Sequence, residues 1–319
     1  MTAGAAAEAG PRFSVVVPSY GCEACLGALH EQLAAVFAKM AASFELVLVD
    51  DHSPQADWSV IASLAGRDPR VRGVKLCRNF GQHAAIAAGL EHARGEWIVV
   101  MDCDLQDPPA EIPRLYEKAM EGFPCVFARR IGRTDDVAKL VLGGAFHRLH
   151  GALAGFRPDA AVGNFSVVSR RVVHELRRLP ERDKNYALLV GWLGFPTAYV
   201  DVAHGPRHAG ESTYTLGRQL RHAVVTVLSQ STRPLYASAA LGLAMAVGAA
   251  ATAGWLVVKK LTSDYVVEGW TSVIVSLFFL FGVLFLNLGV IGLYLGGVFR
   301  ELKGRPAFVV ERTTFDDAA

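Results

Sequence analysis

Two long stretches near the carboxyl end of the chain contain no charged residue. One runs from Leu235 to Val258 over 24 residues, and the other from Thr271 to Phe299 over 29 residues. A helix that crosses the hydrocarbon core of a bilayer needs about 20 consecutive apolar residues. The alternative, two buried helices of a soluble core, would require two fully apolar helices of this length next to each other. The sequence therefore predicts two transmembrane helices, at about 235–258 and 271–299.

The basic residues that flank the two stretches predict their orientation. Seven lie before the first stretch or after the second: Arg218, Arg221, Arg233, Arg300, Lys303, Arg305 and Arg312. Two, Lys259 and Lys260, lie between the stretches. Because cytoplasmic flanks carry the excess of Lys and Arg, we expect a multi-pass protein of the cell membrane with both termini in the cytoplasm. The first twelve residues lack an apolar run, so we expect no cleavable signal.

The segment just before the first apolar stretch has an amphipathic pattern. Residues 214–234 place Leu and Val at helical spacing and gather Arg, Gln and His on the opposite face. Such a helix is typical of segments that lie on a membrane surface in contact with lipid. We therefore expect a cytoplasmic domain over 1–213, an interface helix over 214–234, two membrane helices within 235–299 and a cytoplasmic tail over 300–319.

The first 213 residues alternate between short apolar runs and helical patterns. Strands are expected at 13–17, 44–49, 71–76, 97–101 and 125–128, and helices at 22–40, 58–65 and 83–93. This alternation predicts an α/β fold with right-handed crossovers and a mostly parallel sheet. Ligands of such sheets bind beyond the carboxyl ends of the strands, so the polar residues that follow each strand form the candidate site.

Charge and motif content exclude several classes of protein. Lys and Arg number 32 against 30 Asp and Glu, and no basic run occurs, so we expect no nucleic-acid partner. The glycine-rich phosphate loops of dinucleotide oxidoreductases and P-loop nucleotidases are absent. Five cysteines are too few and too spread for a secreted disulfide framework, which indicates a reducing compartment. Because no second ligand pair completes a zinc site, we interpret Cys22 and Cys25 as two small thiols.

Acidic residues follow two of the expected strands. Asp50 and Asp51 follow the second, while Asp102 and Asp104 follow the fourth, with Gln106 next in phase. Oxygen ligands at this spacing can converge on a hard divalent cation that shares its shell with a diphosphate. An Asp-x-Asp that only shapes a turn is the alternative. The preceding strand and the second acidic pair favour a metal site.

Five segments of the chain carry a resemblance to one enzyme family. They are Val15-Val16-Val17-Pro18-Ser19-Tyr20, Val49-Asp50-Asp51-His52-Ser53, Arg78-Asn79-Phe80-Gly81-Gln82-His83-Ala84-Ala85, Asp102-x-Asp104-Leu105-Gln106-Asp107-Pro108-Pro109 and Arg207-x-Ala209-Gly210-Glu211-Ser212-x-Tyr214. The chain resembles the family 2 glycosyltransferases of the dolichol-phosphate mannose synthase type. It is most similar to bacterial members with two carboxyl-terminal transmembrane helices that glycosylate polyprenyl phosphate. The resemblance covers about residues 12 to 305.

The resemblance implies a GT-A fold and an inverting transfer of one sugar. The donor would be a nucleotide sugar, UDP- or GDP-linked, the acceptor an undecaprenyl-type phosphate, and the cofactor Mg2+ or Mn2+. Matched positions assign the donor site as follows: Pro18, Tyr20 and Glu23 line the nucleotide pocket, Asp50 and Asp51 hold base or ribose, and Arg207 contacts the diphosphate. Asp102 would reach the ribose or the metal shell, and Asp104 with Gln106 would bind the metal.

The acceptor phosphate is already ionised, so its attack needs cations that bring two anions together rather than a general base. Arg129, Arg130 and Arg133 follow an expected strand and are candidates for this task, because a guanidinium grips phosphate oxygens with two bonds. A solvated surface is the alternative for all three. Asp183 is a further candidate, either as a base or orienting carboxylate near the acceptor or as a helix cap.

Some features leave the exact reaction open. Gly163-Asn164-Phe165-Ser166 and Ser212-Thr213-Tyr214 depart from the family's pattern in segments expected to face sugar and diphosphate. An Asp-x-Asp phosphohydrolase fits poorly, since its motif usually follows the first strand. A catalytically silent membrane scaffold for lipid-linked sugar export is the alternative outside enzymes. Small residues in the first apolar stretch allow a homo-oligomer.

Overall fold

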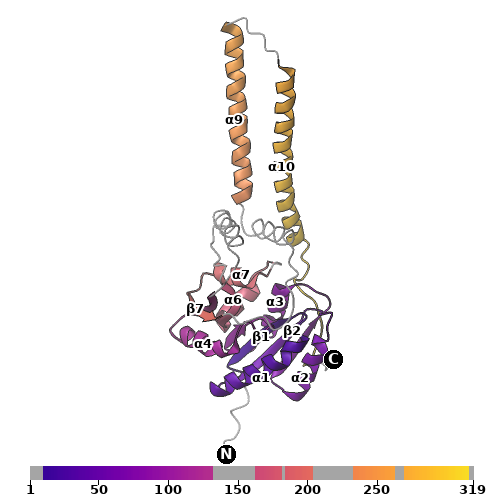
Figure 1. Ribbon diagram of the computed structural model, residues 1–319, viewed down its shortest axis with the longest axis vertical. Coiled ribbons are helices and arrows are strands. Elements are labelled where there is room, and N and C mark those ends of the chain that lie inside the picture. Colours follow the sequence, from indigo (N-terminus) through magenta and orange to yellow (C-terminus); the bar gives the residue numbers. More distant parts are fainter. Residues whose placement is uncertain (1–9, 132–161, 182–183, 204–232, 263–268, 316–319) are drawn as a thin grey trace, which may run out of the picture. The chain divides into compact units, whose positions relative to one another are not determined.

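The computed structural model describes residues 10–131, 162–181, 184–203, 233–262 and 269–315 (Figure 1). The chain divides into two compact units. The first comprises residues 1–136, 158–212 and 305–319, and the second comprises residues 137–157 and 213–304. The predicted interface helix at 214–234 lies outside the described residues except for its last two positions, which begin a long helix.

Four parallel strands form the centre of the first unit. They are β1 (Phe13–Ser19), β2 (Phe44–Asp50), β3 (Val71–Leu76) and β4 (Trp97–Val100), in the order β3-β2-β1-β4. The connecting helices are α1 (Glu23–Lys39), α2 (Asp57–Arg67) and α3 (Gln82–His92). The α/β alternation predicted from the apolar periodicity is confirmed within two residues at most boundaries. The chain moves outward from β1 to β3 and then returns to the other side of β1, which creates a switch point between β1 and β4.

The sheet continues beyond β4 with strands of mixed direction. β6 (Val162–Ser169) pairs antiparallel with β4, β5 (Cys125–Ile131) pairs antiparallel with β6, and β7 (Thr197–Ala203) pairs parallel with β5. The remaining helical segments of this unit are η1 (Pro109–Glu111), α4 (Ile112–Met120), α6 (Arg170–Arg178) and α7 (Tyr186–Trp192). Among the residues that the structure describes, four of the seven strand pairings are parallel, in agreement with the predicted mostly parallel sheet.

The eighth strand comes from the far end of the chain. β8 (Val310–Thr313) follows both long helices in the sequence but pairs antiparallel with β3. The Thr314 hydroxyl accepts a hydrogen bond of 2.8 Å from the Gly73 amide. Lys75 Nζ lies 3.3 Å from the Glu311 carboxylate. Residues 300–319 were predicted to form a cytoplasmic tail, and in the structure part of that segment is an edge strand of the first unit.

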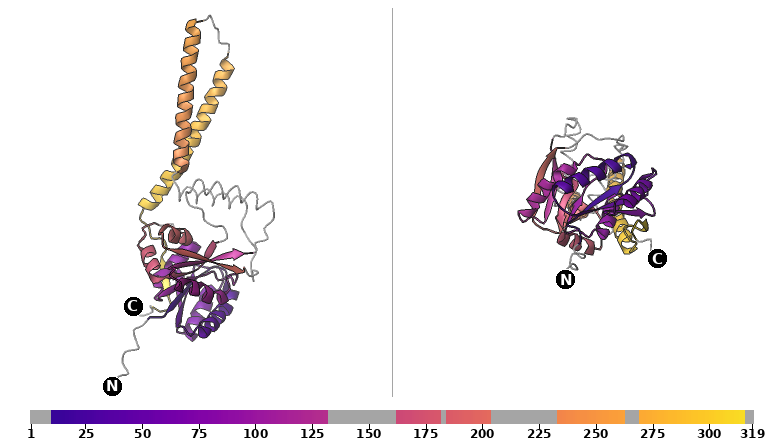
Figure 2. Two further views of the ribbon diagram at one scale, coloured as in Figure 1. Left: turned by 90° about the vertical axis from the view of Figure 1, so that its left-hand side faces the viewer. Right: turned by 90° about the horizontal axis from the view of Figure 1, so that it is seen from below.

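Helices cover both faces of this sheet, as Figure 2 shows from below. Successive side chains of a strand point to opposite faces, and β1 is buried on both. Val15 and Val17 join the core beneath α1, while Val16 joins the core beneath α3. Gly89 of α3 lies directly against Val16 and Val49, where a Cβ would come within 3.1 Å of the Val49 side chain. This close packing fixes α3 against the face of the sheet. The loop that precedes α3 is thereby held at the carboxyl ends of the strands.

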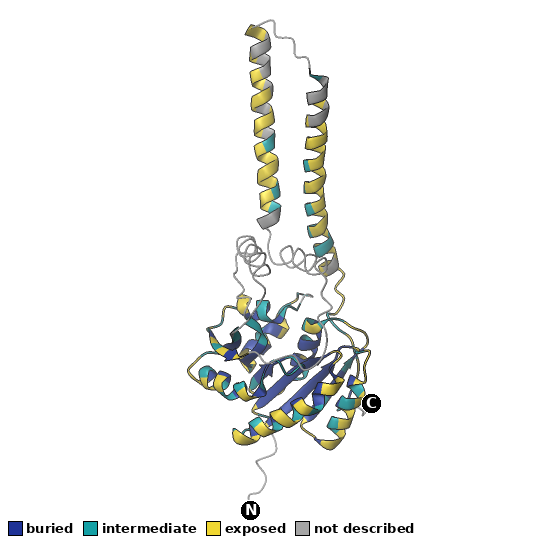
Figure 3. Ribbon diagram, in the orientation of Figure 1, coloured by how far each residue is buried: buried dark blue, intermediate teal, exposed yellow. Residues whose placement is uncertain are grey.

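The second unit contains two long apolar helices, α9 (Arg233–Thr262) and α10 (Trp270–Leu302). They lie side by side, as Figures 1 and 2 show. Most of their described side chains are exposed along the whole length (Figure 3). Within α10, Ser276–Phe299 is a 24-residue segment with a mean hydropathy of 2.3, long and apolar enough to cross a membrane. A shorter apolar segment, Leu235–Ala249, lies within α9.

Candidate functional site

A cavity of about 430 Å³ lies at the carboxyl ends of the parallel strands. Its lining comes from the loops after β1, β2, β3 and β4: Pro18, Ser19, Tyr20, Gly21, Cys22, Asp51, Asn79, Gly81, Gln82, Asp102, Cys103 and Asp104. This is the switch point of the strand order, where open α/β sheets bind their ligands. The cavity is within the range expected for a small-molecule site. The structure therefore brings together Pro18, Tyr20, Asp51, Asp102 and Asp104, all five of which were predicted from the sequence.

The acidic pair after β2 organises the neighbouring loops. Both carboxylate oxygens of Asp51 accept backbone hydrogen bonds, from Phe80 at 2.7 Å and Gly81 at 2.8 Å. Burial raises the pKa of Asp51, although these two amides act in the opposite direction. Asp50 is buried and accepts a bond of 2.8 Å from the Ser53 amide, without lining the cavity. Asp51 thus holds the loop before α3 in place, and a direct role for either carboxylate in holding base or ribose stays a prediction.

The loop after β4 carries the second acidic group. Asp102 Oδ1 accepts a hydrogen bond of 2.6 Å from the Gln82 amide group. Asp102 Oδ2 lies 4.0 Å from Arg130 Nη2, and the same nitrogen donates to Asp107 Oδ1 at 3.1 Å. Desolvation raises the pKa of Asp102 to about 6, and the nearby charges of Asp107 and Asp104 add to the rise. Gln82 and Arg130 thus hold Asp102 in position at the cavity wall.

The donor set at this wall suits a divalent cation. Asp102 and Asp104 present two carboxylates to one cavity, and the negative charge of Asp104 contributes to the raised pKa of Asp102. Mg2+ often binds through one or two carboxylates together with substrate phosphates. The described residues contain no group of three His, Cys, Asp or Glu side chains that could hold a metal ion. Gln106 does not line the cavity, but its amide donates to Asp104 Oδ1 at 3.1 Å.

The backbone of the loop after β4 is unusual beside these ligands. Leu105 adopts a positive φ of 61°, and His52 in the loop after β2 has a φ of 56°. Residues other than glycine seldom occupy this left-handed region, and such positions cluster at ligand sites. Each acidic loop therefore contains a residue with a strained backbone next to a carboxylate of the cavity: His52 follows Asp51, and Leu105 follows Asp104.

Sequence reasoning missed the residue that holds the loop after β1. Asp57, the first residue of α2, is fully buried, and its Oδ2 accepts bonds from the Ser19 hydroxyl at 2.5 Å and the Cys22 amide at 3.1 Å. Its position as the first residue of a helix was the available signal, since Asp is favoured there.

Glu23, which was predicted to line the nucleotide pocket, does not line the cavity. Its carboxylate accepts a hydrogen bond of 3.2 Å from the Ala56 backbone amide.

The arginines proposed for the acceptor phosphate lie differently from the expectation. Arg129 and Arg130 belong to β5 itself rather than to a loop after it. Arg129 forms an exposed ion pair of 2.6 Å with Asp201 on the adjacent strand β7. Arg130 faces Asp102 and Asp107 at the cavity wall instead. Of the other predicted site residues, Arg133, Asp183 and Arg207 lie outside the described residues.

One interpretation of the cysteines was wrong. Cys22, at the start of α1, is joined by a disulfide to Cys103, which lies between Asp102 and Asp104. The two Cα atoms are 6.2 Å apart, within the range of protein disulfides. Cys25 is buried and free. Cys22 and Cys25 are close in the chain and were interpreted as two small thiols, whereas the fold brings Cys22 to a partner 81 residues away.

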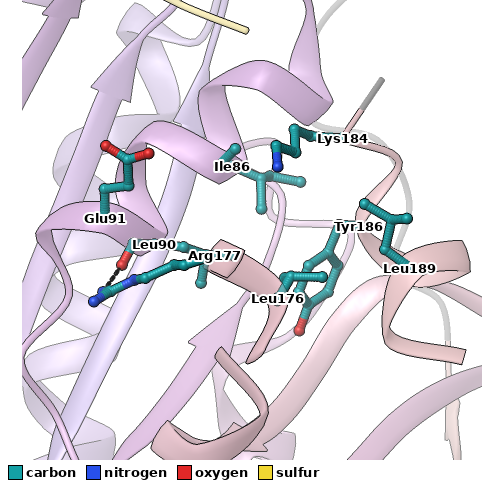
Figure 4. Close-up of a pocket in the computed structure, with 9 residues that line it drawn as sticks. Ile86, Leu90, Glu91, Leu176, Arg177, Lys184, Tyr186 and Leu189 are labelled. Atoms are coloured by element: carbon teal, nitrogen blue, oxygen red, sulfur yellow. Dashed lines mark hydrogen bonds between the residues drawn. The ribbon is translucent and has the colours of Figure 1, made fainter. Parts of the chain in front are cut away.

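A second cavity lies between α3, α6 and α7, and Figure 4 shows the side chains around it. Its volume is about 30 Å³, which is room for water but not for a nucleotide. The Arg177 guanidinium donates to the backbone carbonyls of Leu90 and Ala93, and Lys184 Nζ donates to the Leu179 carbonyl at 2.5 Å. Both cations are thus engaged with the backbone, and we interpret this cavity as a packing gap.

Comparison with known proteins identifies the class to which this fold and cavity belong. Residues 14–177 match the model of the family described as glycosyl transferase family 2, and the chain belongs to that family. The match includes β1 to β4, the cavity lining and both acidic loops.

Two characterised relatives are similar over nearly the whole chain. The bactoprenol glucosyl transferase of Shigella phage SfII is 32% identical over 303 residues, which cover 95% of this chain and 98% of that protein. The undecaprenyl-phosphate 4-deoxy-4-formamido-L-arabinose transferase of Pseudomonas aeruginosa (strain LESB58) is 33% identical over 310 residues, covering 94% and 89%. Among solved structures, the glucosyl-3-phosphoglycerate synthase from Mycobacterium tuberculosis in complex with Mn2+ and UDP-glucose gives a TM-score of 0.49 at 22% identity, covering 70% of this chain and 79% of that chain.

Proposed function

We propose that this protein is an inverting glycosyltransferase that moves one sugar from a nucleotide sugar to polyprenyl phosphate at the cytoplasmic leaflet of the cell membrane. The observation that carries the proposal is the similarity over nearly the full length to two transferases named for bactoprenol and undecaprenyl phosphate. A catalytically silent scaffold is not favoured, because the acidic residues of the cavity are intact and positioned by their neighbours.

The cavity supplies the donor site of the proposed reaction. Pro18 and Tyr20 form its wall after β1, and the loop held by Asp51 forms the wall after β3. Tyr20 is 53% exposed, which leaves its ring accessible to a flat base. Asp102 and Asp104 line the part of the cavity formed by the loop after β4. If the nucleoside of the donor binds beside Tyr20, its diphosphate would lie next to these two carboxylates.

Asp102 and Asp104 would hold a divalent cation, Mg2+ or Mn2+, which when bound neutralises the charge that develops on the departing nucleoside diphosphate. The protein's own task is to keep these two carboxylates in place. Gln82 and Arg130 do this for Asp102, while the backbone amide of Gln106 does so for Asp104. In the proposed reaction Arg207 contacts the donor diphosphate, and this role rests on the sequence motif that contains it.

The acceptor needs no dedicated base, because a phosphate monoester is already ionised at neutral pH. Its approach requires positive charge beside an acidic cavity. The Arg130 guanidinium lies between Asp102 and Asp107 and is 30% exposed, so it offsets part of the negative charge that an incoming phosphate would meet at this wall. Arg129, Arg133 and Asp183 remain sequence-based candidates for the acceptor side.

The pairing of β8 with β3 supports two membrane crossings. β8 follows α9 and α10 in the chain, yet it belongs to the same sheet as β1 to β4, which precede them. A sheet cannot be divided by a bilayer, so the segments on either side of the two helices must lie on one side of the membrane. The number of crossings between them is therefore even. One segment of α10 is long and apolar enough to cross the membrane. Because an even number of crossings needs a second helix, α9 provides the other crossing in this proposal.

The test is a transfer reaction with the purified full-length protein in detergent. The protein is incubated with undecaprenyl phosphate, Mg2+ and a panel of UDP- and GDP-sugars, and the lipid is analysed by mass spectrometry. We expect one donor to add the mass of one sugar residue to the lipid phosphate. Asp104→Asn should express and insert in the membrane normally but give no product, and EDTA should abolish the reaction of the wild type.

A binding measurement separates an enzyme from a silent scaffold. UDP or GDP with Mn2+ should raise the melting temperature of the wild type, and EDTA should remove that stabilisation. Absence of both nucleotide stabilisation and sugar transfer across the panel would refute the proposal. Transfer to a water-soluble acceptor in place of the lipid would refute the acceptor assignment while leaving the donor site intact.

A further inference from the structure

A disulfide joins the two loops that face each other across the donor cavity. Cys22 directly precedes α1 and follows Tyr20 and Gly21, while Cys103 lies between the two carboxylates proposed to bind the cation. Both cysteines line the cavity, and each is only 7% exposed. The bond therefore connects the wall that would contact the nucleoside to the wall that would contact the diphosphate.

The location of this bond makes it unusual. In the proposed function, on which this inference rests, the domain faces the cytoplasm. Disulfides of cytoplasmic proteins are seldom structural and are usually transient bonds of catalytic or redox-sensing sites. Both side chains line the cavity, so the cavity offers a route to the disulfide. A small thiol or disulfide entering the empty cavity can thus reach a bond that a bound nucleotide would cover.

The bonded arrangement holds both cation ligands in contact with other groups of the chain. Asp102 Oδ1 accepts from Gln82 at 2.6 Å, and Asp102 Oδ2 lies 4.0 Å from Arg130. Asp104 Oδ1 accepts from the Gln106 amide at 3.1 Å. A cation that binds through both carboxylates competes with the Gln82 and Gln106 donors for their oxygens, and side-chain and loop movement between Asp102 and Gln106 eases that exchange. A covalent bond from the middle of that loop to the residue before α1 restrains the movement.

We propose that Cys22 and Cys103 form a reversible disulfide that weakens binding of the divalent cation and nucleotide, so that the oxidation state of the pair regulates the transferase. In the dithiol form the loop after β4 is free to bring Asp102 and Asp104 together. In the disulfide form it stays tied to α1. Misplaced or unsupported metal ligands typically cost about 10-fold to 100-fold in metal affinity, and we expect an effect of at least about 10-fold.

The bond forms by exchange with a low-molecular-weight disulfide. One cysteine sulfur, having lost its proton, attacks a sulfur of the small disulfide, and one small thiolate leaves as the mixed disulfide forms. The second cysteine sulfur then attacks the protein sulfur of that mixed disulfide and displaces the second small thiolate. Two protein thiols are oxidised by two electrons, and the small disulfide is reduced to two small thiols. Excess small thiol drives the same steps in reverse.

The first test measures the bond without any turnover. Full-length protein in detergent is equilibrated with oxidised or reduced glutathione, free thiols are blocked, and the peptides are analysed by mass spectrometry. We expect a Cys22–Cys103 cross-link after oxidation and both cysteines blocked after reduction. UDP with Mn2+ should slow the oxidation. A cross-link of Cys22 to Cys25, or no cross-link, would overturn the inference.

The second test measures Mn2+ binding in the presence of UDP or GDP by electron paramagnetic resonance, after removal of the glutathione. The oxidised wild type should bind Mn2+ at least about 10-fold more weakly than the reduced wild type. Cys22→Ser and Cys103→Ser should each give one Mn2+ affinity under both conditions. Cys77→Ser is the matched control, since Cys77 is exposed and free, and it should keep the full difference.

The outcomes distinguish this inference from the proposed function. Equal Mn2+ affinity in the oxidised and reduced wild type, or no binding in either, would overturn the inference. If either serine variant fails to fold, the comparison of the two wild-type forms still decides the question. If no donor on the panel gives a lipid product while the Mn2+ affinity still changes with oxidation, the proposed reaction fails and the redox-sensitive cation site stands.

Discussion

Two neighbouring arginines on β5 should respond very differently to replacement by alanine. Arg130 Nη2 donates to Asp107 Oδ1 at 3.1 Å, and the Asp107 side chain is 3% exposed. Asp107 Oδ2 has no hydrogen-bond partner among the described residues. Arg129 pairs with Asp201 at 2.6 Å, but both of those side chains are more than 40% exposed. In the Arg130–Asp107 ion pair the carboxylate is therefore shielded from water, whereas both side chains of the Arg129–Asp201 ion pair are solvated.

The magnitude follows from what each substitution leaves behind. Removing one partner of a buried ion pair leaves an uncompensated charge and costs about 3–5 kcal/mol. We take the lower end, about 3 kcal/mol, for Arg130→Ala, because the Arg130 side chain is 30% exposed. At roughly 2–4 °C per kcal/mol for a domain of this size, the melting temperature should fall by about 6–12 °C. Arg129→Ala should leave it unchanged, since solvated surface pairs contribute little.

The assay is thermal unfolding of the detergent-purified variants, followed by near-ultraviolet circular dichroism at pH 7 without nucleotide. Arg130→Lys should fall between the wild type and Arg130→Ala, because it keeps the charge but loses the planar guanidinium. Equal shifts for Arg129→Ala and Arg130→Ala would refute the reasoning, since they would show that burial of Asp107 does not set the cost. A larger shift for Arg129→Ala would do the same.

Three further substitutions test other contacts of the first unit. Hydrogen bonds from Arg70 hold the pKa of Asp68 well below its usual range, so its contribution to stability is full above about pH 4 and declines as the pH falls toward the lower pKa of the folded protein. Thermal unfolding should show Asp68→Asn destabilised at pH 7 and somewhat less destabilised at pH 3, with the difference from the wild type closing further at still lower pH. Thr314→Val leaves the Gly73 amide without its acceptor and should cost about 1–3 kcal/mol in urea unfolding, whereas Thr314→Ser keeps the hydroxyl and should cost less than half as much. Gly95→Ala places a Cβ 2.6 Å from a backbone carbon of β1 and should lower the yield of folded protein in size-exclusion chromatography, so an unchanged yield would contradict the described packing.

The central fold was predictable because its signals are local. The parallel strands are mostly apolar, with charged residues inside them at Glu45 of β2 and at Arg72 and Lys75 of β3, and the helices between them span more than two turns. The carboxyl ends of parallel strands meet at one edge, so Asp51, Asp102 and Asp104 could be placed in one site without knowledge of any contact. The motifs that resemble the glycosyltransferase family lie in the loops after these strands, so the resemblance predicted the same site.

The features that escaped prediction depend on contacts between distant residues. Cys22 and Cys103 become neighbours only because β1 and β4 are adjacent in the sheet. Arg129 and Arg130 were assigned to a loop because charge ended the apolar run of β5. In the structure they continue that strand, where Arg129 meets Asp201 directly across from it on β7.

β8 has a consequence for how the molecule is made. Translation proceeds from the amino end, so β1 to β7 leave the ribosome before α9 and α10, and β8 leaves after both. Throughout that interval β3 remains an open edge, with backbone groups able to pair with any exposed strand that comes near. The nascent first unit is thus most prone to aggregate while α9 and α10 are being made. Only a chain that has been translated beyond both helices can cap its own sheet.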